Sequence, residues 1–130
     1  VYVSAKIEFE LASLSAEDQQ AFLNDLGITE SGLDKISRTC FEKLGLINFF
    51  TAGIIEVRAW QIKNGSTAQK ASAAIHTDFE KNFIKAEVVS FEDFVSLNGW
   101  KGAREKGKAR LEGRDYIVKD GDAIEFKIGS

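Results

Sequence analysis

A run of basic residues with a tryptophan in front of it is the part of this sequence best suited to bind a ligand. Residues 101–119 hold seven basic and three acidic side chains, which leaves +4 in a chain whose net charge is −3. Phosphates attract Lys and Arg whatever the base sequence, and an exposed tryptophan can stack on an unpaired base. We therefore expect an RNA contact surface made by Trp100, Lys101, Arg104, Lys106, Lys108, Arg110 and Arg114.

The same residues also have a simpler explanation. A basic run is common in solvated loops, and Trp100 would then anchor its loop by packing on a sheet. Residues 46–130 carry 13 basic and 12 acidic side chains, a net charge of +1, which argues against tight binding to naked nucleic acid. In favour of ligand binding, Gly102 and Gly107 would let the backbone approach a ligand closely.

The residue types that usually perform catalysis or bind metals are scarce. His76 is the only histidine and Cys40 the only cysteine, so neither a metal site nor a catalytic triad is indicated. We expect His76 to be a structural residue at a helix end, hydrogen-bonded to the backbone. Cys40 lies on an apolar helical stripe, where a small core residue is expected.

Composition indicates an ordinary globular chain, with 44% hydrophobic and 28% charged residues. Apolar runs long enough to span a bilayer are missing, so we expect no membrane partner. A single cysteine fits a cytoplasmic setting. The sequence contains no Met, from which we expect a piece of a longer protein.

The first 45 residues predict three short helices. Ile7, Leu11 and Leu14 share one helical face. Ser15 with Asp18, and Ser31 with Asp34, mark two further helix starts, and Gly27 and Gly45 mark their ends. The last helix would bury a stripe formed by Leu33, Ile36, Cys40 and Leu44.

A mixed sheet with a helix across one face is predicted after Gly45. Strands are indicated at 55–63 and 84–88, with a helix capped by Thr67 between them and another capped by Ser90 after them. Residues 101–106 would add one or two helical turns. The segments 116–118 and 123–128 read as two strands joined by a tight turn at Gly121.

Residues 47–130 resemble the TGS domain of YchF-type P-loop NTPases. The resemblance rests on Phe-Phe-Thr-Ala-Gly at 49–53, Glu-Val-Arg-Ala-Trp at 56–60, Ile-His-Thr-Asp at 75–78, Phe-Ile-Lys-Ala-Glu-Val at 83–88 and the stretch 112–122. It implies an α+β fold: a β-grasp (ubiquitin-like) TGS domain over 46–130. Residues 1–45 would be the C-terminal end of the nucleotide-binding domain plus short helices.

The resemblance also implies a nucleotide site upstream. Val1–Val3 would be the last strand of the nucleotide-binding domain, and Ser4, Ala5 and Lys6 resemble its base-contacting loop. The longer parent would bind ATP or GTP with Mg²⁺. The chain itself has no G-x-x-x-x-G-K-[ST] loop, because its glycines at 99–107 and 113 do not match one, so we expect neither a cofactor nor hydrolysis here.

Two functions are therefore expected. The first is the C-terminal docking region of a ribosome-associated ATPase or GTPase, contacting the ribosome, structured RNA or a ribosomal protein. The alternative is a protein-interaction module that binds a partner through the face or edge of the β-grasp sheet. The oligomeric state is left open.

Overall fold

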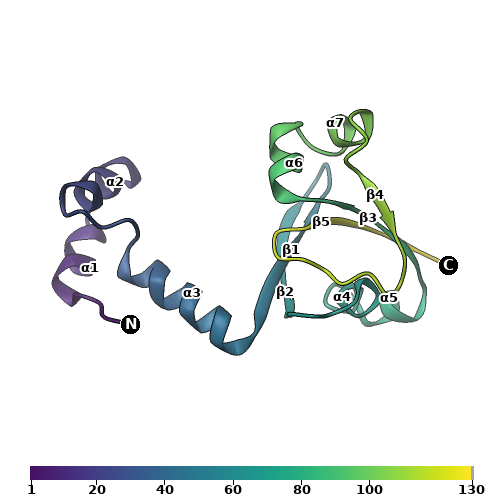
Figure 1. Ribbon diagram of the computed structural model, residues 1–130, viewed down its shortest axis with the longest axis horizontal. Coiled ribbons are helices and arrows are strands. Elements are labelled where there is room, and N and C mark those ends of the chain that lie inside the picture. The colour runs from purple at the N-terminus through teal and green to yellow at the C-terminus, as the bar shows by residue number, and fades with distance from the viewer. Residues whose placement is uncertain (130) are drawn as a thin grey trace. The chain divides into compact units, whose positions relative to one another are not determined.

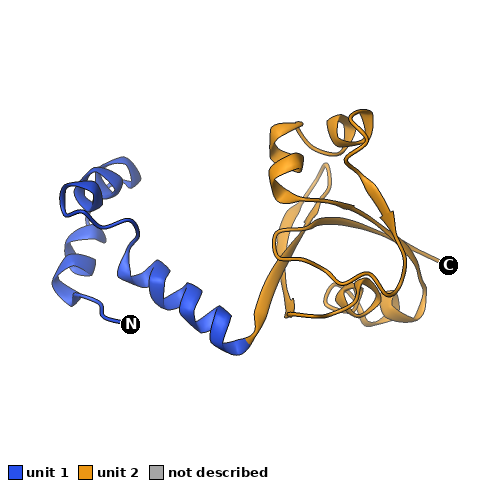
Figure 2. Cartoon of the chain, viewed as in Figure 1, with its two compact units in different colours: residues 1–44 blue, residues 45–130 orange. Residues whose placement is uncertain are grey.

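The structure is a computed structural model that describes residues 1–129, and the chain divides into two compact units, Val1–Leu44 and Gly45–Ser130 (Figure 2). Three helices form the first unit: α1 (Ala5–Leu11), α2 (Ala16–Asp25) and α3 (Gly32–Leu44) (Figure 1). Ser15 and Ser31 cap α2 and α3 as predicted, because their hydroxyls accept from the Asp18 and Asp34 amides. Gly27 and Gly45 end them with positive φ, also as predicted.

The first unit has a small core. Leu11 and Leu23 are its buried apolar residues, and the Glu8 carboxylate ties α1 to α3 by accepting from the amides of Gly32 at 2.7 Å and Leu33 at 3.3 Å. The predicted buried stripe of α3 is wrong, because Leu33, Ile36 and Leu44 are exposed and Cys40 with them. Helical periodicity identifies an apolar face but does not supply anything to cover it.

Residues 1–3 are in no strand in this structure, and their expected place in the sheet of a longer parent stays a prediction. Val1, Tyr2 and Val3 are exposed, and Ser4 caps α1. A strand needs a neighbour for its backbone hydrogen bonds, and none lies beside these residues in the structure.

The second unit is a mixed α+β structure built on a five-stranded sheet. The strands are β1 (Leu46–Ala52), β2 (Val57–Lys63), β3 (Phe83–Val89), β4 (Arg110–Glu112) and β5 (Ala123–Ile128), and their order is β2-β1-β5-β3-β4. Central β5 runs antiparallel to β3 and parallel to β1, with Phe50 opposite Ala123 as the registered β1–β5 pair. The helices are α4 (Ala68–Ser72), α5 (Thr77–Lys81), α6 (Phe91–Ser96) and α7 (Trp100–Glu105).

Helices lie on both sides of this sheet: α4 and α5 on one side, α6 and α7 on the other (Figure 1). The hydrophobic core occupies the first side, where α4 packs Ala68 and Ala71 against Phe49, Phe83 and Ile124. Side chains alternate across a strand, so Glu87 and Glu125 point to the second side. The second side of the sheet is therefore where polar groups can be held in position.

The strand predictions need correction. Strands β1 and β4 were not predicted. The expected hairpin of 116–118 with 123–128 does not form, since β5 pairs with β3 and β1, and Ile117 makes an isolated bridge to Thr67. Ile84 was expected to share the buried face of its strand with Ala86 and Val88, but it is exposed because the register shifts between Phe83 and Lys85 and places Phe83 in the core.

Candidate docking site

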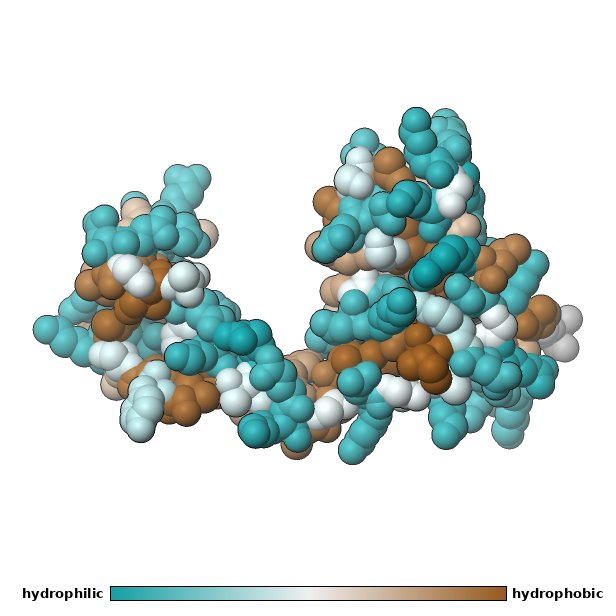
Figure 3. Space-filling view, in the orientation of Figure 1, coloured by the Kyte–Doolittle hydropathy of each residue, from teal (hydrophilic) through white to brown (hydrophobic). Residues whose placement is uncertain are grey.

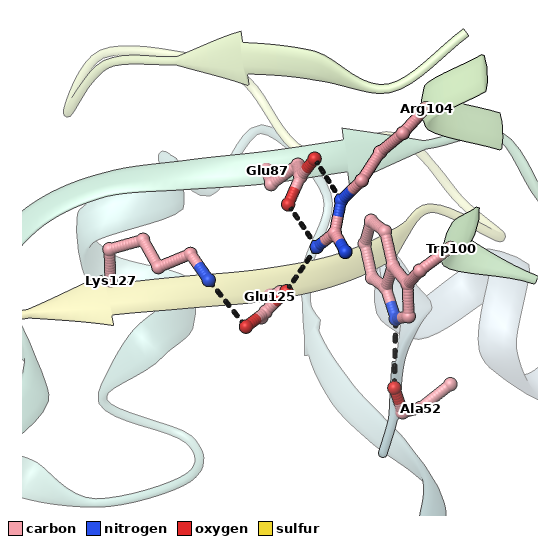
Figure 4. Close-up of polar contacts among 6 residues, drawn as sticks. All are labelled: Ala52, Glu87, Trp100, Arg104, Glu125 and Lys127. Atoms are coloured by element: carbon pink, nitrogen blue, oxygen red, sulfur yellow. Dashed lines mark hydrogen bonds and ion pairs between the residues drawn. The ribbon is translucent and has the colours of Figure 1, made fainter. Parts of the chain in front are cut away.

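An ion-pair ladder crosses the second side of the sheet, formed by Glu87, Arg104, Glu125 and Lys127 (Figure 4). The Arg104 guanidinium on α7 donates to both oxygens of Glu87 on β3, with distances of 2.8 Å and 2.7 Å. It also donates to Glu125 on β5 at 2.9 Å, and Lys127 pairs with the other oxygen of Glu125. The ladder fixes α7 on the two central strands.

The contact between Arg104 and Glu87 shifts the pKa values of both groups. Hydrogen bonds from Arg104 lower the pKa of the Glu87 carboxyl, although its burial opposes this. The Glu87 carboxylate in turn raises the pKa of Arg104. Glu87 is 9% exposed, so its charge depends on this partner. Arg104 is therefore engaged within the fold.

Trp100 joins α7 to the end of β1. Its indole N–H donates to the Ala52 carbonyl oxygen at 2.8 Å, its ring packs edge-on against Phe94 at 5.3 Å, and Arg104 lies 5.5 Å from the ring centroid (Figure 4). The half-buried ring therefore serves as an anchor, the simpler of the two expected roles. Close approach at Gly102 is to the chain itself, because a Cβ there would lie 1.8 Å from the Leu97 carbonyl oxygen.

The remaining cations of the basic run (residues 101–119) differ in their surroundings. Lys108 lies 3.5 Å from Asp93, Arg110 lies 3.7 Å from Glu112, and Arg114 donates to the Phe83 carbonyl at 3.3 Å. Lys101 and Lys106 are exposed and take part in none of the ion pairs found among residues 1–129. The available positive charge is thus smaller than the sequence count.

A second group of basic side chains surrounds a pocket of about 270 Å³, where Lys108 and Arg110 meet Lys119. Asp122 is buried there and accepts from the Tyr116 hydroxyl at 2.8 Å and from the Lys119 amide at 2.9 Å. Burial, assisted by the hydrogen bond to Asp122, raises the pKa of Tyr116 to about 12. Of the basic run, Lys108, Arg110 and Lys119 thus line this pocket and Arg104 belongs to the ladder, while the other members belong to neither.

An apolar groove of about 890 Å³ opens beside the ladder. Its lining includes Ile54 and Val57 near the β1–β2 turn, Phe79 on α5, Phe126 on β5 and Trp100. Lys101 and the ladder residues Arg104, Glu125 and Lys127 add charge to its wall. The sequence prediction missed this groove, and the one available signal was the adjacent pair Ile54-Ile55 in a turn, where polar residues are usual.

The other residues singled out in the sequence have structural roles. His76 caps α5, with its Nδ1 accepting from the Asp78 amide at 3.2 Å, so the predicted structural role is confirmed. Cys40 is exposed, so the predicted core role is wrong. Within residues 1–129, no cluster of three or more His, Cys, Asp or Glu residues is placed to hold a metal ion.

The expected nucleotide-loop residues begin α1. Ser4 caps the helix through the Ile7 amide at 3.4 Å, followed by Ala5 and Lys6 in its first turn. The expectation that the glycines at 99–107 do not match a phosphate loop was wrong for their spacing, since Gly102, Gly107 and Lys108 fit it, but Ala109 replaces the hydroxyl residue and Gly102–Glu105 is helical. The segment from Gly102 to Ala109 therefore does not fit the phosphates or Mg²⁺ of a nucleotide.

One known protein family matches most of the chain. Residues 46–129 match the family model YchF-GTPase_C, described as a protein of unknown function (DUF933). The chain belongs to this family. In the part of this YchF-type chain that the structure describes, no helix is long and apolar enough to cross a membrane.

Similar proteins are longer than this YchF-type chain. It is 55% identical over 98% of its length to the "Ribosome-binding ATPase YchF" of Haemophilus influenzae, and covers 35% of that protein. The human "Obg-like ATPase 1" is 47% identical over 98% of the chain, which spans 32% of it. The solved YchF GTPase of Schizosaccharomyces pombe aligns with a TM-score of 0.83 at 34% identity, over 96% of this chain and 33% of that one. The chain thus spans about a third of these relatives.

Proposed function

We propose that these 130 residues act as the C-terminal ribosome-docking region of a YchF-type NTPase, with a β-grasp TGS domain over 46–130. Residues 1–45 would be the end of its nucleotide-binding domain, and the whole protein would act in the cytoplasm. The observation that carries the proposal is the alignment of 98% of the chain with a protein named as a ribosome-binding ATPase.

The parent protein would hydrolyse ATP or GTP with Mg²⁺, and this chain would not. The Walker A requirements are a glycine-rich loop, a Lys and a Ser or Thr hydroxyl, and Ala109 stands where the last is needed. Phosphate release from ATP and GTP should therefore not exceed that of a buffer blank. Turnover above the blank would contradict this assignment.

The basic run would contact RNA phosphates. Lys101 and Lys106 are the strongest candidates, because they are exposed and lie outside the ion pairs of residues 1–129. Lys108, Arg110 and Arg114 would add contacts by exchanging their present partners for phosphate, whereas Arg104 and Trp100 would hold α7 in place. Because phosphate contacts carry little sequence information, the preference for RNA sequence should be slight.

Co-sedimentation with ribosomes at several salt concentrations tests this proposal. Replacing Lys101 and Lys106 by Gln should reduce the steepness of log K against log salt by roughly 0.7 per lost contact. Replacing Lys35 and Lys43 by Gln removes the same charge from the first unit and should leave the slope unchanged. Equal slopes for both double variants would overturn the basic run as the contact surface.

A ribosomal protein or another protein partner is the second candidate. The apolar groove favours it, because an apolar surface with few available cations suits a protein segment better than a polyanion. Binding through this groove should depend weakly on salt. A steep salt slope for wild type would favour RNA instead.

A further inference from the structure

The turn between β1 and β2 holds apolar side chains in solvent. Ile54 and Ile55 expose 107% and 99% of their reference area, and Val57 exposes 72%. The Gly53 amide donates to the Glu56 carbonyl at 2.9 Å and closes the turn, so the two isoleucines are held on an ordered tip. Exposed aliphatic side chains gain nothing from folding, and their cost is recovered only when a partner covers them.

The tip continues into the groove. Ile54 and Val57 line it together with Phe79, Trp100 and Phe126, so apolar residues of the turn and of the sheet share one groove. A volume of about 890 Å³ lies in the range of pockets that enclose whole ligands. The groove can therefore receive several side chains of a partner.

A free strand edge forms one wall of the groove. The Phe50 amide donates to the Asp122 carbonyl at 2.8 Å, and Phe50 opposite Ala123 is the registered pair of β1 with β5. Strand β1 ends two residues later at Ala52, whereas β5 continues to Ile128. The consecutive residues Ile124–Lys127 all line the groove, as expected where the backbone edge of β5 faces it.

Trp100 lies where the pairing of β1 with β5 ends. Its indole N–H donates to the Ala52 carbonyl oxygen (Figure 4). That oxygen would accept a hydrogen bond from β5 if the parallel pairing of the two strands continued. The other edge of β5 is paired with β3 through the strand. A backbone partner for β5 can therefore enter only from the groove.

We propose that an extended segment of a partner protein adds as a strand to this edge of β5, in line with β1. Its backbone pairs with residues 124–128, and its aliphatic side chains cover Ile54 and Val57. This deepens the protein-docking candidate above and does not depend on RNA contacts by the basic run.

Charge selects an acidic residue in that segment. Arg104 and Lys127 on the groove wall are already paired with Glu87 and Glu125. Lys101 lies on the same wall outside the ion pairs of residues 1–129, so it is available for a carboxylate from the partner. The segment is therefore extended, aliphatic at alternate positions and acidic at the position nearest Lys101.

Selection from a phage-displayed library of random peptides of about six residues tests the proposal. The selected peptides should alternate aliphatic residues and carry Asp or Glu. Their addition should increase the hydrogen-exchange protection of amides in 124–128. Methylating alternate backbone nitrogens of a selected peptide should abolish binding on one alternation and spare it on the other, because only every second amide faces β5.

Matched variants locate the site. Replacing Ile54 and Ile55 by Ser should raise Kd at least about tenfold, and Lys101→Glu should reverse the preference from acidic to basic peptides. Ile84→Ser, an exposed isoleucine outside the groove, is the control and should leave Kd unchanged.

Failure to enrich any peptide, or equal affinity of wild type and the Ile54/Ile55 double variant, overturns the proposal. So does occupation of the groove by RNA or by a second copy. Binding of RNA would appear as changes in the NMR chemical shifts of Ile54 and Phe126 when a single-stranded oligonucleotide is added. Binding of a second copy would appear as self-association that is lost when Ile54 and Ile55 are replaced. Ribosome binding that persists without peptide binding would leave the proposed ribosome role intact and refute only this site.

Discussion

Arg104 donates two parallel hydrogen bonds, 2.8 Å and 2.7 Å long, to the carboxylate of Glu87, a residue 17 positions away in the chain. A forked guanidinium matches a carboxylate in this geometry and restricts both side chains. The Arg104 side chain is 48% exposed and the Glu87 side chain 11% exposed, so the pair lies at the boundary between solvent and sheet. Its main consequence is the position of α7, and with it that of Trp100.

Removing Arg104 should destabilise the second unit. Arg104→Gln leaves the nearly buried Glu87 carboxylate without its main partner, which we expect to cost about 2 kcal/mol after allowance for the exposed guanidinium. Urea unfolding measures the change. Lys101→Gln, one helical turn away, should change stability by less than about 0.5 kcal/mol. Equal effects of the two substitutions would show that the ladder contributes no stability.

The same pair predicts a dependence of stability on pH. The folded-state pKa of Glu87 is lowered, so its contribution is complete above the unfolded value of about 4.3 and is lost as pH falls through the folded value. The gap in unfolding free energy between wild type and Glu87→Gln should be widest near neutral pH and should narrow below about pH 4. A gap that stays constant down to acid pH would contradict the assignment.

Gly102 should not tolerate a side chain. A Cβ at this position would lie 1.8 Å from the Leu97 carbonyl oxygen, so Gly102→Ala must separate α6 from α7 at a cost of about 2 kcal/mol or more. Gly113→Ala is the matched control, since a Cβ at Gly113 meets nothing within 4 Å. Thermal unfolding of the two variants makes the comparison. Equal midpoints would mean that α6 and α7 are not packed this closely.

Cys40 should react with a thiol reagent in the native state. The side chain is exposed on α3, so one thiol per chain should titrate with 5,5′-dithiobis(2-nitrobenzoate) without denaturant. The rate in urea is the reference, and native protein should react at a similar rate. Strong protection in the native protein would indicate that another surface covers this face of α3.

Hydrogen exchange should separate the two units. Leu11 and Leu23 are the buried apolar residues of the first unit, whereas the core of the second contains Phe49, Phe83 and Ile124 among others. Apolar side chains reach the surface of both units (Figure 3). Amides of α1 to α3 should therefore exchange faster than those of β3 and β5. Equal protection in the two units would contradict this expectation.

Local features of the fold were readable in the amino-acid sequence. Ser15 with Asp18, Ser31 with Asp34, and Ser90 with Asp93 were recognised as helix starts because each cap joins residues only three positions apart. Gly27, Gly45 and Gly121 were recognised as turn or helix-end positions, and all three have positive φ. The helix-end role of His76 is local in the same way. The resemblance to YchF-type proteins came from strings of residues and was confirmed by the family match.

Tertiary structure decided what depends on contacts between distant residues. Pairing of β5 with β3 and β1 replaced the predicted local hairpin, because strand partners are chosen by burial across the whole sheet. Three of the seven basic side chains in the run, Arg104, Lys108 and Arg110, pair with Glu87, Asp93 and Glu112, whose proximity a charge count does not reveal. The stripe of α3 stayed exposed because periodicity creates an apolar face without supplying a neighbour. The groove exists because β1 ends at Ala52 while β5 continues, a difference in strand length that only the assembled sheet brings out.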